Sequence, residues 1–420
     1  MLLILLHLSS LLRNLDTLAM RSLTTIVFLM LLVVAAFPRD QLTLTSVEER
    51  VAPYQFNIAI WEPAHLSSKW THLFLTKTFP YPHSDEEKRT QVTKYFQLQA
   101  EYQGLHQDLI ETAATRPEQV KNTEKRLQDK ADEIKALQPW VEETVESLIT
   151  DELRRQEIPI TIGPFTFPPV DIAFDLLPTI LVTSPRTEIN RLDSFLLKPA
   201  LSPTTRDSIE EMLLDKEDLS SIVEDLGGLA TYPAIVDSRN LLRSLVIGSH
   251  EWLHNHLVFH PLGKNYNLDE NTRSLNETTA NIFGEELGQS IYHRYTTNTA
   301  PTPQAPSTEP RCEPPRFCFN QVMRETRLRV DDLLTQGNLT EAEAYMEDQR
   351  LLFVQNGYLI RKLNQAYFAF HGTYANNPSS NSPIDSQLHQ YRERSPSLGT
   401  FIHTLQSISS YDEFLLRREE

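Results

Sequence analysis

The sequence predicts an α+β protein that is mostly helical, with a small mixed sheet packed on one central helix. Three observations predict this class. Glycine is scarce, with 12 residues in 420, whereas proline is frequent, with 26, which is typical of helices joined by stiff connections. Charged segments with apolar residues at helical spacing occupy both halves of the chain. Between them lies a block rich in β-branched and aromatic residues, and strands between helical blocks indicate an α+β fold.

The N-terminal segment, residues 1–40, is strongly apolar. From Leu23 to Phe37 there are fifteen residues without a charge, preceded by Arg21. This length is short for a membrane-spanning helix and suits the core of a signal peptide. We therefore expect a signal peptide or membrane anchor, and a protein that is membrane-anchored or secreted, with the bulk of the chain outside the cytoplasm.

Net charge and cysteine content narrow the classes of partner. With 39 basic and 56 acidic residues the formal charge is −17, and such a surface repels phosphate backbones, so we expect no nucleic-acid partner. The two cysteines, Cys312 and Cys318, are flanked by prolines without a second pair, which makes a poor zinc site. In an oxidising compartment they are expected to form a small disulfide loop.

The segment 41–160 is predicted to contain a short strand, a helix and then a long helical hairpin over 85–156. The hairpin region lacks runs of glycine and carries its apolar residues at helical spacing. Pro117 suits the first turn of the second helix, and Pro139 is a point where that helix could kink. The hairpin could serve as a stalk, as a partner-binding arm or as a flank of the next domain.

The segment 161–296 is predicted to be the functional core, because it contains the histidine-rich segment. Short strands are expected in the proline-punctuated stretch before residue 186, and another in "GGLATYPAIVD". Helices are expected over 203–214 and 218–226, then in the histidine-rich segment, capped by Asp237 or Ser238, and then in "SLNETTANIFGEELGQSIYHRY". A Pro/Thr-rich linker or loop, 297–318, precedes a helical C-terminal subdomain, 319–420, with helices over 321–335 and 340–370.

The stretch "GSHEWLHNHLVFHPLG" holds four histidines and a glutamate within eleven residues. On a helix, positions four apart share one face, so His250 and His254 can point at one metal ion. Glu251 is rotated by about 100 degrees and stands beside such an ion, where it can accept a proton from metal-activated water. These residues predict a zinc site, with Glu251 as general base.

A catalytic zinc needs a third protein ligand and one open position. His256 lies on the wrong face of the helix, two residues after His254. His260 has the separation from His250 that metzincins use, but Leu257 stands where that family needs a glycine for the chain to turn. Glu277 follows after 22 residues, enough to leave the helix and begin another. Glu277 and His260 therefore remain the candidates for the third ligand.

At this point the sequence resembles the gluzincin zinc peptidases, the thermolysin-like clan, over about residues 229–293. In that clan H-E-x-x-H on one helix is joined by a glutamate within N-E-x-x-A on the next, as in "HEWLH" and "NETTA" here. The resemblance implies zinc bound by His250, His254 and Glu277, with Glu251 as the base. The small Ala280 would let the two helices approach. Asn281 stands where the clan often has an aspartate that orients a ligand histidine.

The resemblance also implies a peptide or protein substrate, held along an edge strand in "LATYPAIV" before the active helix. The glycine-x-Met-Glu-Asn pattern of zinc aminopeptidases is absent, which favours an endopeptidase. For the transition-state donor the sequence offers four weak candidates: Tyr292, His293, Tyr367 and His371. The alternative hypothesis is a catalytically inactive envelope interaction protein that uses the helical hairpin and retains a relic zinc site.

Overall fold

The computed structural model describes residues 44–65, 69, 84–115, 119–162, 165–297 and 317–418. The chain divides into two compact units, Met1–Ala52 and Pro53–Glu420. In the first unit, helix α2 (Ser46–Val51) begins with a capping box between Thr45 and Glu48. The expected signal peptide or anchor, 1–40, lies outside the described residues. Among the residues described, no helix has the length and apolarity that crossing a membrane requires.

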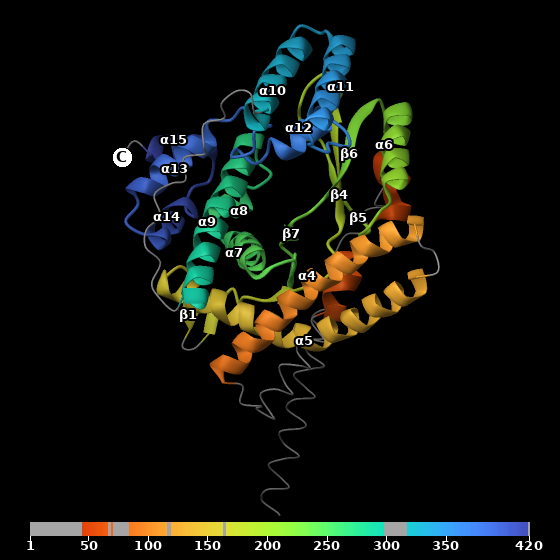
Figure 1. The fold of residues 1–420 in the computed structure, drawn as a ribbon. Coiled ribbons are helices and arrows are strands. Elements are labelled where there is room, and N and C mark those ends of the chain that lie inside the picture. Colours follow the sequence, from red (N-terminus) through yellow and green to blue (C-terminus); the bar gives the residue numbers. More distant parts are fainter. Residues whose placement is uncertain are drawn as a thin grey trace, which may run out of the picture. The chain divides into compact units, whose positions relative to one another are not determined.

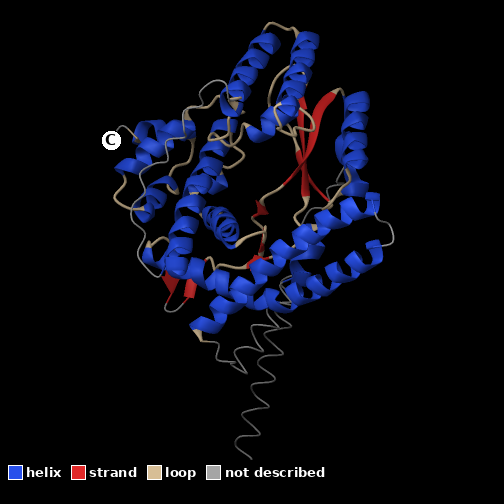
Figure 2. Ribbon diagram, viewed as in Figure 1, coloured by secondary structure: helices blue, strands red, loops and turns tan. Residues whose placement is uncertain are grey.

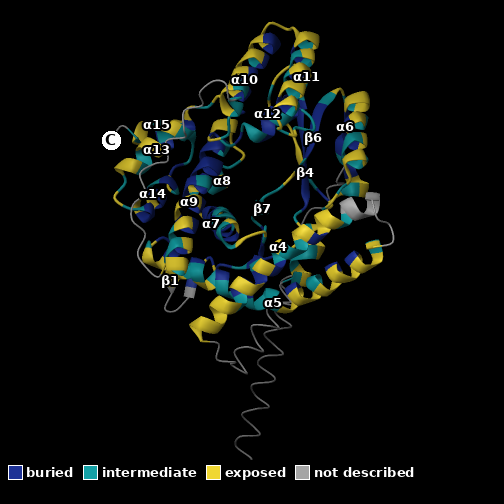
Figure 3. Cartoon of the chain, in the orientation of Figure 1, coloured by how far each residue is buried: buried dark blue, intermediate teal, exposed yellow. Residues whose placement is uncertain are grey.

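The second unit is α+β and mostly helical, as predicted (Figure 1, Figure 2). The predicted hairpin is formed by α4 (Asp85–Thr115) and α5 (Val120–Arg155), which pack along each other. Pro139 lies inside α5 without ending it. A buried stripe at four-residue spacing attaches α5 to the core: Val141, Val145, Ile149 and Leu153. The hairpin carries long exposed stretches, whereas α9 is largely buried beside α7 (Figure 3).

A three-stranded mixed sheet packs on the histidine-rich helix, as predicted. Its order is β3-β8-β7, so β7 (Gly228–Leu229) lies at an edge. The central strand β8 (Ala234–Val236) is parallel to β3 (Ile172–Ala173) and antiparallel to β7. The segment "GGLATYPAIVD" therefore forms two short strands, where we expected one. A further antiparallel pair, β1 (Ile160–Ile162) and β2 (Phe165–Phe167), precedes this sheet.

A second three-stranded sheet is antiparallel, in the order β5-β4-β6. Its strands are β5 (Ser194–Leu197), β4 (Thr179–Pro185) and β6 (Leu219–Asp225). On its outer edge Gln55 forms one bridge with Leu197, which stands in place of the strand expected near residue 55. The helix that we expected after it occupies residues 58–65.

The predicted helix over 218–226 is wrong, because this segment is strand β6. The preceding helix α6 (Pro203–Glu217) stops at Asp218, which has a left-handed backbone with φ of 53°. Ile222 and Val223 are β-branched, fully buried and paired with β4. Pairing with β4, some forty residues earlier in the chain, makes this segment a strand. The local spacing of its apolar residues does not reveal that pairing.

The C-terminal part is helical, as predicted, but the helix expected over 340–370 is two helices. The first, α11 (Leu339–Gln355), ends before Gly357, whose φ of 87° breaks the helix. The second, α12 (Gln365–His371), starts at the cap Asn364. The other helices of this part are α10 (Phe319–Thr335), α13 (Ile384–Arg394), α14 (Leu398–Leu405) and α15 (Tyr411–Arg417). Cys318, before α10, is disulfide-bonded, whereas Cys312 lies outside the described residues.

Candidate metal centre

Helix α7 (Leu241–Leu257) carries the histidine-rich segment and is seen nearly end-on beside α9 in Figure 1. Its cap is Asn240, whose side-chain oxygen accepts a hydrogen bond from the Arg243 backbone N–H at 2.8 Å. The predicted caps, Asp237 and Ser238, were wrong by two to three residues. Asp237 instead accepts a hydrogen bond from the Arg243 side chain at 2.8 Å and ties the start of the helix to the strand before it.

Helix α9 (Glu270–Thr297) approaches α7 closely because glycines line their contact. A Cβ atom added at Gly284 would lie 2.7 Å from the backbone oxygen of Val246. One added at Gly288 would lie 2.7 Å from the Val246 Cα. Any side chain at these positions would push the helices apart. The close crossing brings Glu277 of α9 to the histidines of α7.

His250, His254 and Glu277 meet in one group that could hold a metal ion, with their ligand atoms within 4.8 Å of one another. The two Nε2 atoms of the histidines are 3.0 Å apart. Oε2 of Glu277 lies 3.4 Å from His254 Nε2 and 3.7 Å from His250 Nε2. The structure therefore brings together, from two helices, the three residues that the sequence proposed as ligands, although 22 residues lie between His254 and Glu277.

The donor atoms of this group fit a transition metal. Oε2 of Glu277 is buried and has no hydrogen-bond partner. This oxygen is therefore available as a ligand on the side of Glu277 that faces the two histidines. The other oxygen, Oε1, accepts a hydrogen bond from the Tyr266 hydroxyl at 2.5 Å. His250 hydrogen-bonds to the Ala280 backbone and to the Asn281 side chain, which leaves its Nε2 directed at the group. Two imidazoles and one carboxylate are a common set for zinc and related ions.

The surroundings of the two histidines shift their pKa values in opposite directions. Burial lowers the pKa of His250 to about 4, and the charge of His254 adds to this effect. Burial also disfavours the charged form of His254, but the Glu277 carboxylate outweighs it and raises the pKa of His254 to about 9. Without an ion, the group therefore keeps one neutral and one charged imidazole against Glu277.

The pKa values of Glu277 and Glu251 are also shifted in opposite directions. Burial disfavours ionisation of Glu277, but the charge of the neighbouring His254 prevails and lowers the pKa of Glu277 to about 2. Glu251 makes no such pair. Burial, assisted by the negative charge of Glu277, raises the pKa of Glu251 to about 8. A carboxyl group with a pKa near neutrality is suited to taking up and releasing a proton.

Glu251 lies beneath the edge strand β7. A Cβ atom added at Gly228 would lie 2.3 Å from Glu251 Oε1 and 2.5 Å from Ile247 Cγ2. Only a glycine leaves room for the carboxylate at this point of the strand. The edge of the mixed sheet and the carboxylate are therefore direct neighbours.

The remaining histidines of the stretch lie outside the group. His256 is buried, and its Nε2 shares a hydrogen bond of 2.7 Å with Oε1 of Gln406. His260 comes after the end of α7, at the N-cap of the short helix α8 (Pro261–Lys264). Its ring stacks near that of His256, with centroids 4.5 Å apart. Both belong to the packing between α7 and the C-terminal helices.

The four predicted donor candidates have other contacts. Tyr292 and His293 lie fifteen and sixteen residues beyond Glu277 on the same helix, more than about 20 Å along its axis. The centroid of the Tyr367 ring lies 4.3 Å from that of the His371 ring. No contact of any of the four with the three ligand residues is found in the part of the chain that the structure describes.

Two tyrosines that the sequence did not single out lie at the centre. Tyr266, in the loop after α8, hydrogen-bonds to Glu277, and its ring stands edge-on to that of His254 at 6.3 Å. Tyr374 follows α12, and the next residue, Ala375, hydrogen-bonds through its N–H to the Thr278 hydroxyl at 3.1 Å. The charge of Glu277, with burial and the charge of Glu251, raises the pKa of Tyr374 far above its usual value.

Neither tyrosine carries a sequence signal, because both come from loops. The glycines could have been found, since Ala280, Gly284 and Gly288 form a stripe at four-residue spacing on the predicted ligand helix. Comparisons of the chain with protein-family models, with curated proteins and with solved structures find no match.

Proposed function

We propose that this protein is a zinc-dependent peptidase of the gluzincin type, most simply an endopeptidase. The observation that carries the proposal is the buried group of His250, His254 and Glu277, whose free Oε2 lies between two imidazoles, with the isolated carboxyl of Glu251 beside it. Zinc held there would supply a Lewis acid that acidifies a water molecule and polarises a carbonyl group.

The residues of the chain have distinct parts in such a reaction. Glu251 takes a proton from the attacking water onto its carboxylate and later delivers it to the departing amine. Tyr266 fixes Glu277 through its other oxygen, and the Asn281 amide and Ala280 carbonyl fix the ring of His250. Tyr374, kept protonated by Glu277, is the group that could donate a hydrogen bond to the oxyanion.

The edge strand supports a peptide as the substrate. In the order β3-β8-β7, no strand among the described residues pairs with the outer side of β7, and a Cβ added at Gly228 on this strand would meet Glu251. An extended peptide added along this edge would place its backbone next to the general base. This arrangement favours hydrolysis within an extended chain. No described observation favours the interaction-protein alternative over it.

The decisive experiment combines metal content with hydrolysis. Wild type and Glu251→Gln should both bind zinc, and Glu251→Gln should lose about 10²–10⁴-fold in cleavage of casein or of quenched peptides. Glu277→Gln should lose the metal, whereas the matched change His260→Asn should keep both metal and activity.

Two results would contradict this proposal. Bound zinc with no hydrolysis that depends on Glu251 would favour an interaction protein with a relic site. Loss of metal from His260→Asn, with metal retained by Glu277→Gln, would show that the ligand set is wrong.

A further inference from the structure

Two arginines near the metal centre have no carboxylate partner among the described residues. Arg191 lies in the loop between β4 and β5 and is half-buried. It donates a hydrogen bond to the Ser194 hydroxyl at 2.6 Å, and its guanidinium lies 5.9 Å from the centroid of the Phe370 ring. Arg273 lies in the first turn of α9. Its Nε atom is buried without a hydrogen-bond partner, and its Nη2 makes a long contact of 3.4 Å with Asn267.

Most of the partly buried arginines among the described residues pair with a carboxylate. Acidic residues outnumber basic ones by 56 to 39, so a carboxylate is seldom far from a cation. Other arginines with partly buried side chains do form ion pairs with carboxylates: Arg186, Arg206, Arg327, Arg350, Arg361 and Arg392. Removing a guanidinium from water without a counter-charge is costly, so a ligand that supplies the charge would be bound favourably.

Both arginines stand beside the tyrosines of the metal centre. The Arg273 guanidinium lies 5.7 Å from the ring centroid of Tyr266, whose hydroxyl binds Glu277. On the other side, Phe370 joins Arg191 to Tyr374, because its ring contacts the Tyr374 ring at 6.3 Å. The two cations therefore come from different elements, the β4–β5 loop and α9. Arg273 lies against Tyr266, and the Phe370 ring lies between Arg191 and Tyr374.

The electrostatics agree with this placement. Burial and the charge of Glu277 raise the pKa of Tyr266, and the charges of Arg191 and Arg273 both oppose that rise. Arg191 acts on Tyr374 in the same sense. The charge of Arg273 also acts on Glu270 and opposes the rise in its pKa that burial causes, but the two side chains form no ion pair within 4 Å. The positive field of the pair is therefore directed at the tyrosine side of the metal centre.

We propose that Arg191 and Arg273 receive a carboxylate of the substrate next to the bond that is cleaved. The inference rests on the proposed peptidase function and adds a substrate class to it. A planar guanidinium matches a carboxylate through two parallel hydrogen bonds. The carboxylate can come from an Asp or Glu side chain or from the C-terminus of a short peptide, and these two sources share one chemistry.

The experiment compares kcat/KM for matched peptides. In the first set, the two peptides of each pair differ only by Glu or Gln at one position near the cleaved bond. In the second set, the two peptides differ only by a free or an amidated C-terminus. In one of these comparisons, kcat/KM of the wild type should be roughly 10-fold or more higher for the carboxylate peptide than for its amide counterpart. Arg191→Gln and Arg273→Gln should each reduce this ratio toward one while the metal stays bound. Arg191→Glu should favour a peptide with Lys at that position.

The outcomes separate this inference from the proposed function. The surface change Arg329→Gln is the control and should leave the ratio unchanged. Absence of all hydrolysis by zinc-loaded wild type would overturn the peptidase proposal itself. Hydrolysis with equal kcat/KM for carboxylate and amide in both sets would overturn the arginine pair alone, as would a preference that neither Arg191→Gln nor Arg273→Gln reduces.

Discussion

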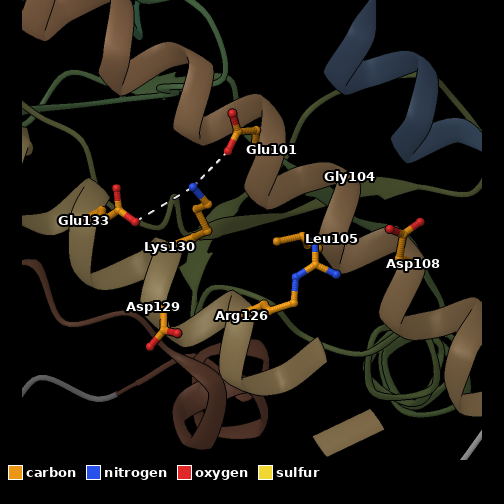
Figure 4. Close-up of a pocket in the computed structure, with 8 residues that line it drawn as sticks. All are labelled: Glu101, Gly104, Leu105, Asp108, Arg126, Asp129, Lys130 and Glu133. Carbon is orange, nitrogen blue, oxygen red and sulfur yellow. Dashed lines mark ion pairs between the residues drawn. The ribbon is translucent and has the colours of Figure 1, made fainter. Parts of the chain in front are cut away.

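Two clusters of ionisable side chains differ sharply, one in the helical hairpin and one at the crossing of α7 and α9. The hairpin cluster lines an open pocket of about 540 Å³ between α4 and α5 (Figure 4). Its central cation is already paired, since Nζ of Lys130 lies 3.0 Å from Glu101 and 3.8 Å from Glu133. The pocket is large, but the acidic partners of Lys130 are exposed to solvent.

The metal centre is the opposite case. It has only three ligand atoms and one free carboxyl beside them, all largely buried, yet their pKa values are about 2, 4, 8 and 9. One oxygen of Glu277 makes no hydrogen bond among the described residues. The comparison teaches that a site is marked by buried groups whose hydrogen-bonding and charge remain unsatisfied, and that the size of a hollow is a poor guide.

The largest expected difference concerns one carboxylate from each cluster in the metal-free protein. The folded pKa of Glu251 is about 8, above its ordinary value of 4.5, so this group opposes folding increasingly as pH rises from 4.5 to 8. Glu251→Gln should therefore be near-neutral at pH 4.5 and stabilise the protein by a few kcal/mol, as an order of magnitude, at pH 8. Urea unfolding with a chelator measures this.

The matched change in the hairpin, Glu101→Gln, should have the opposite sign. The hydrogen bond with Lys130 lowers the pKa of Glu101, so its charge supports folding above pH 4.5, and this support is lost as pH falls. The effect should be small because the pair is exposed to solvent and salt. If both changes gave the same sign at pH 8, the contrast between the clusters would fail.

A second pair of changes tests the glycines of helix interiors. Gly284→Ala places a Cβ 2.7 Å from the Val246 backbone, so it should destabilise the protein by about 1–3 kcal/mol and weaken metal binding. Gly104→Ala, in α4 of the hairpin, meets nothing within 4 Å and should stabilise by up to about 1 kcal/mol. Thermal unfolding and metal titration check both, and an unchanged metal affinity in Gly284→Ala would refute the role of the close crossing.

The smallest expected effect concerns the edge strand. Gly228→Ala would collide with Glu251 and should lower kcat about 10-fold, near 1.4 kcal/mol, with metal content unchanged. Gly227→Ala is the matched control, because its Cβ would meet only ordinary contacts at 3.6 Å and beyond. Equal activity of the two variants would show that the strand does not position the base.

Much of the molecule followed from local pattern. The hairpin helices, α7 and α9 begin and end within a few residues of their predicted limits. The wrong predictions have physical reasons. The local sequence of β6 favours a helix, but pairing with β4 makes it a strand. Likewise Gly357 ended a helix that the apolar spacing alone would continue to residue 370.

For the candidate site, the sequence by itself determined the elements that local geometry defines. His250 and His254 share a face because a helix repeats after about four residues, and Glu277 was reachable because a second helix follows. Only the tertiary structure decided how near Glu277 comes, through Gly284 and Gly288. It alone also brought Tyr266, Tyr374 and Arg191 together, because loops carry no periodic signal and their contacts depend on the packing of distant elements.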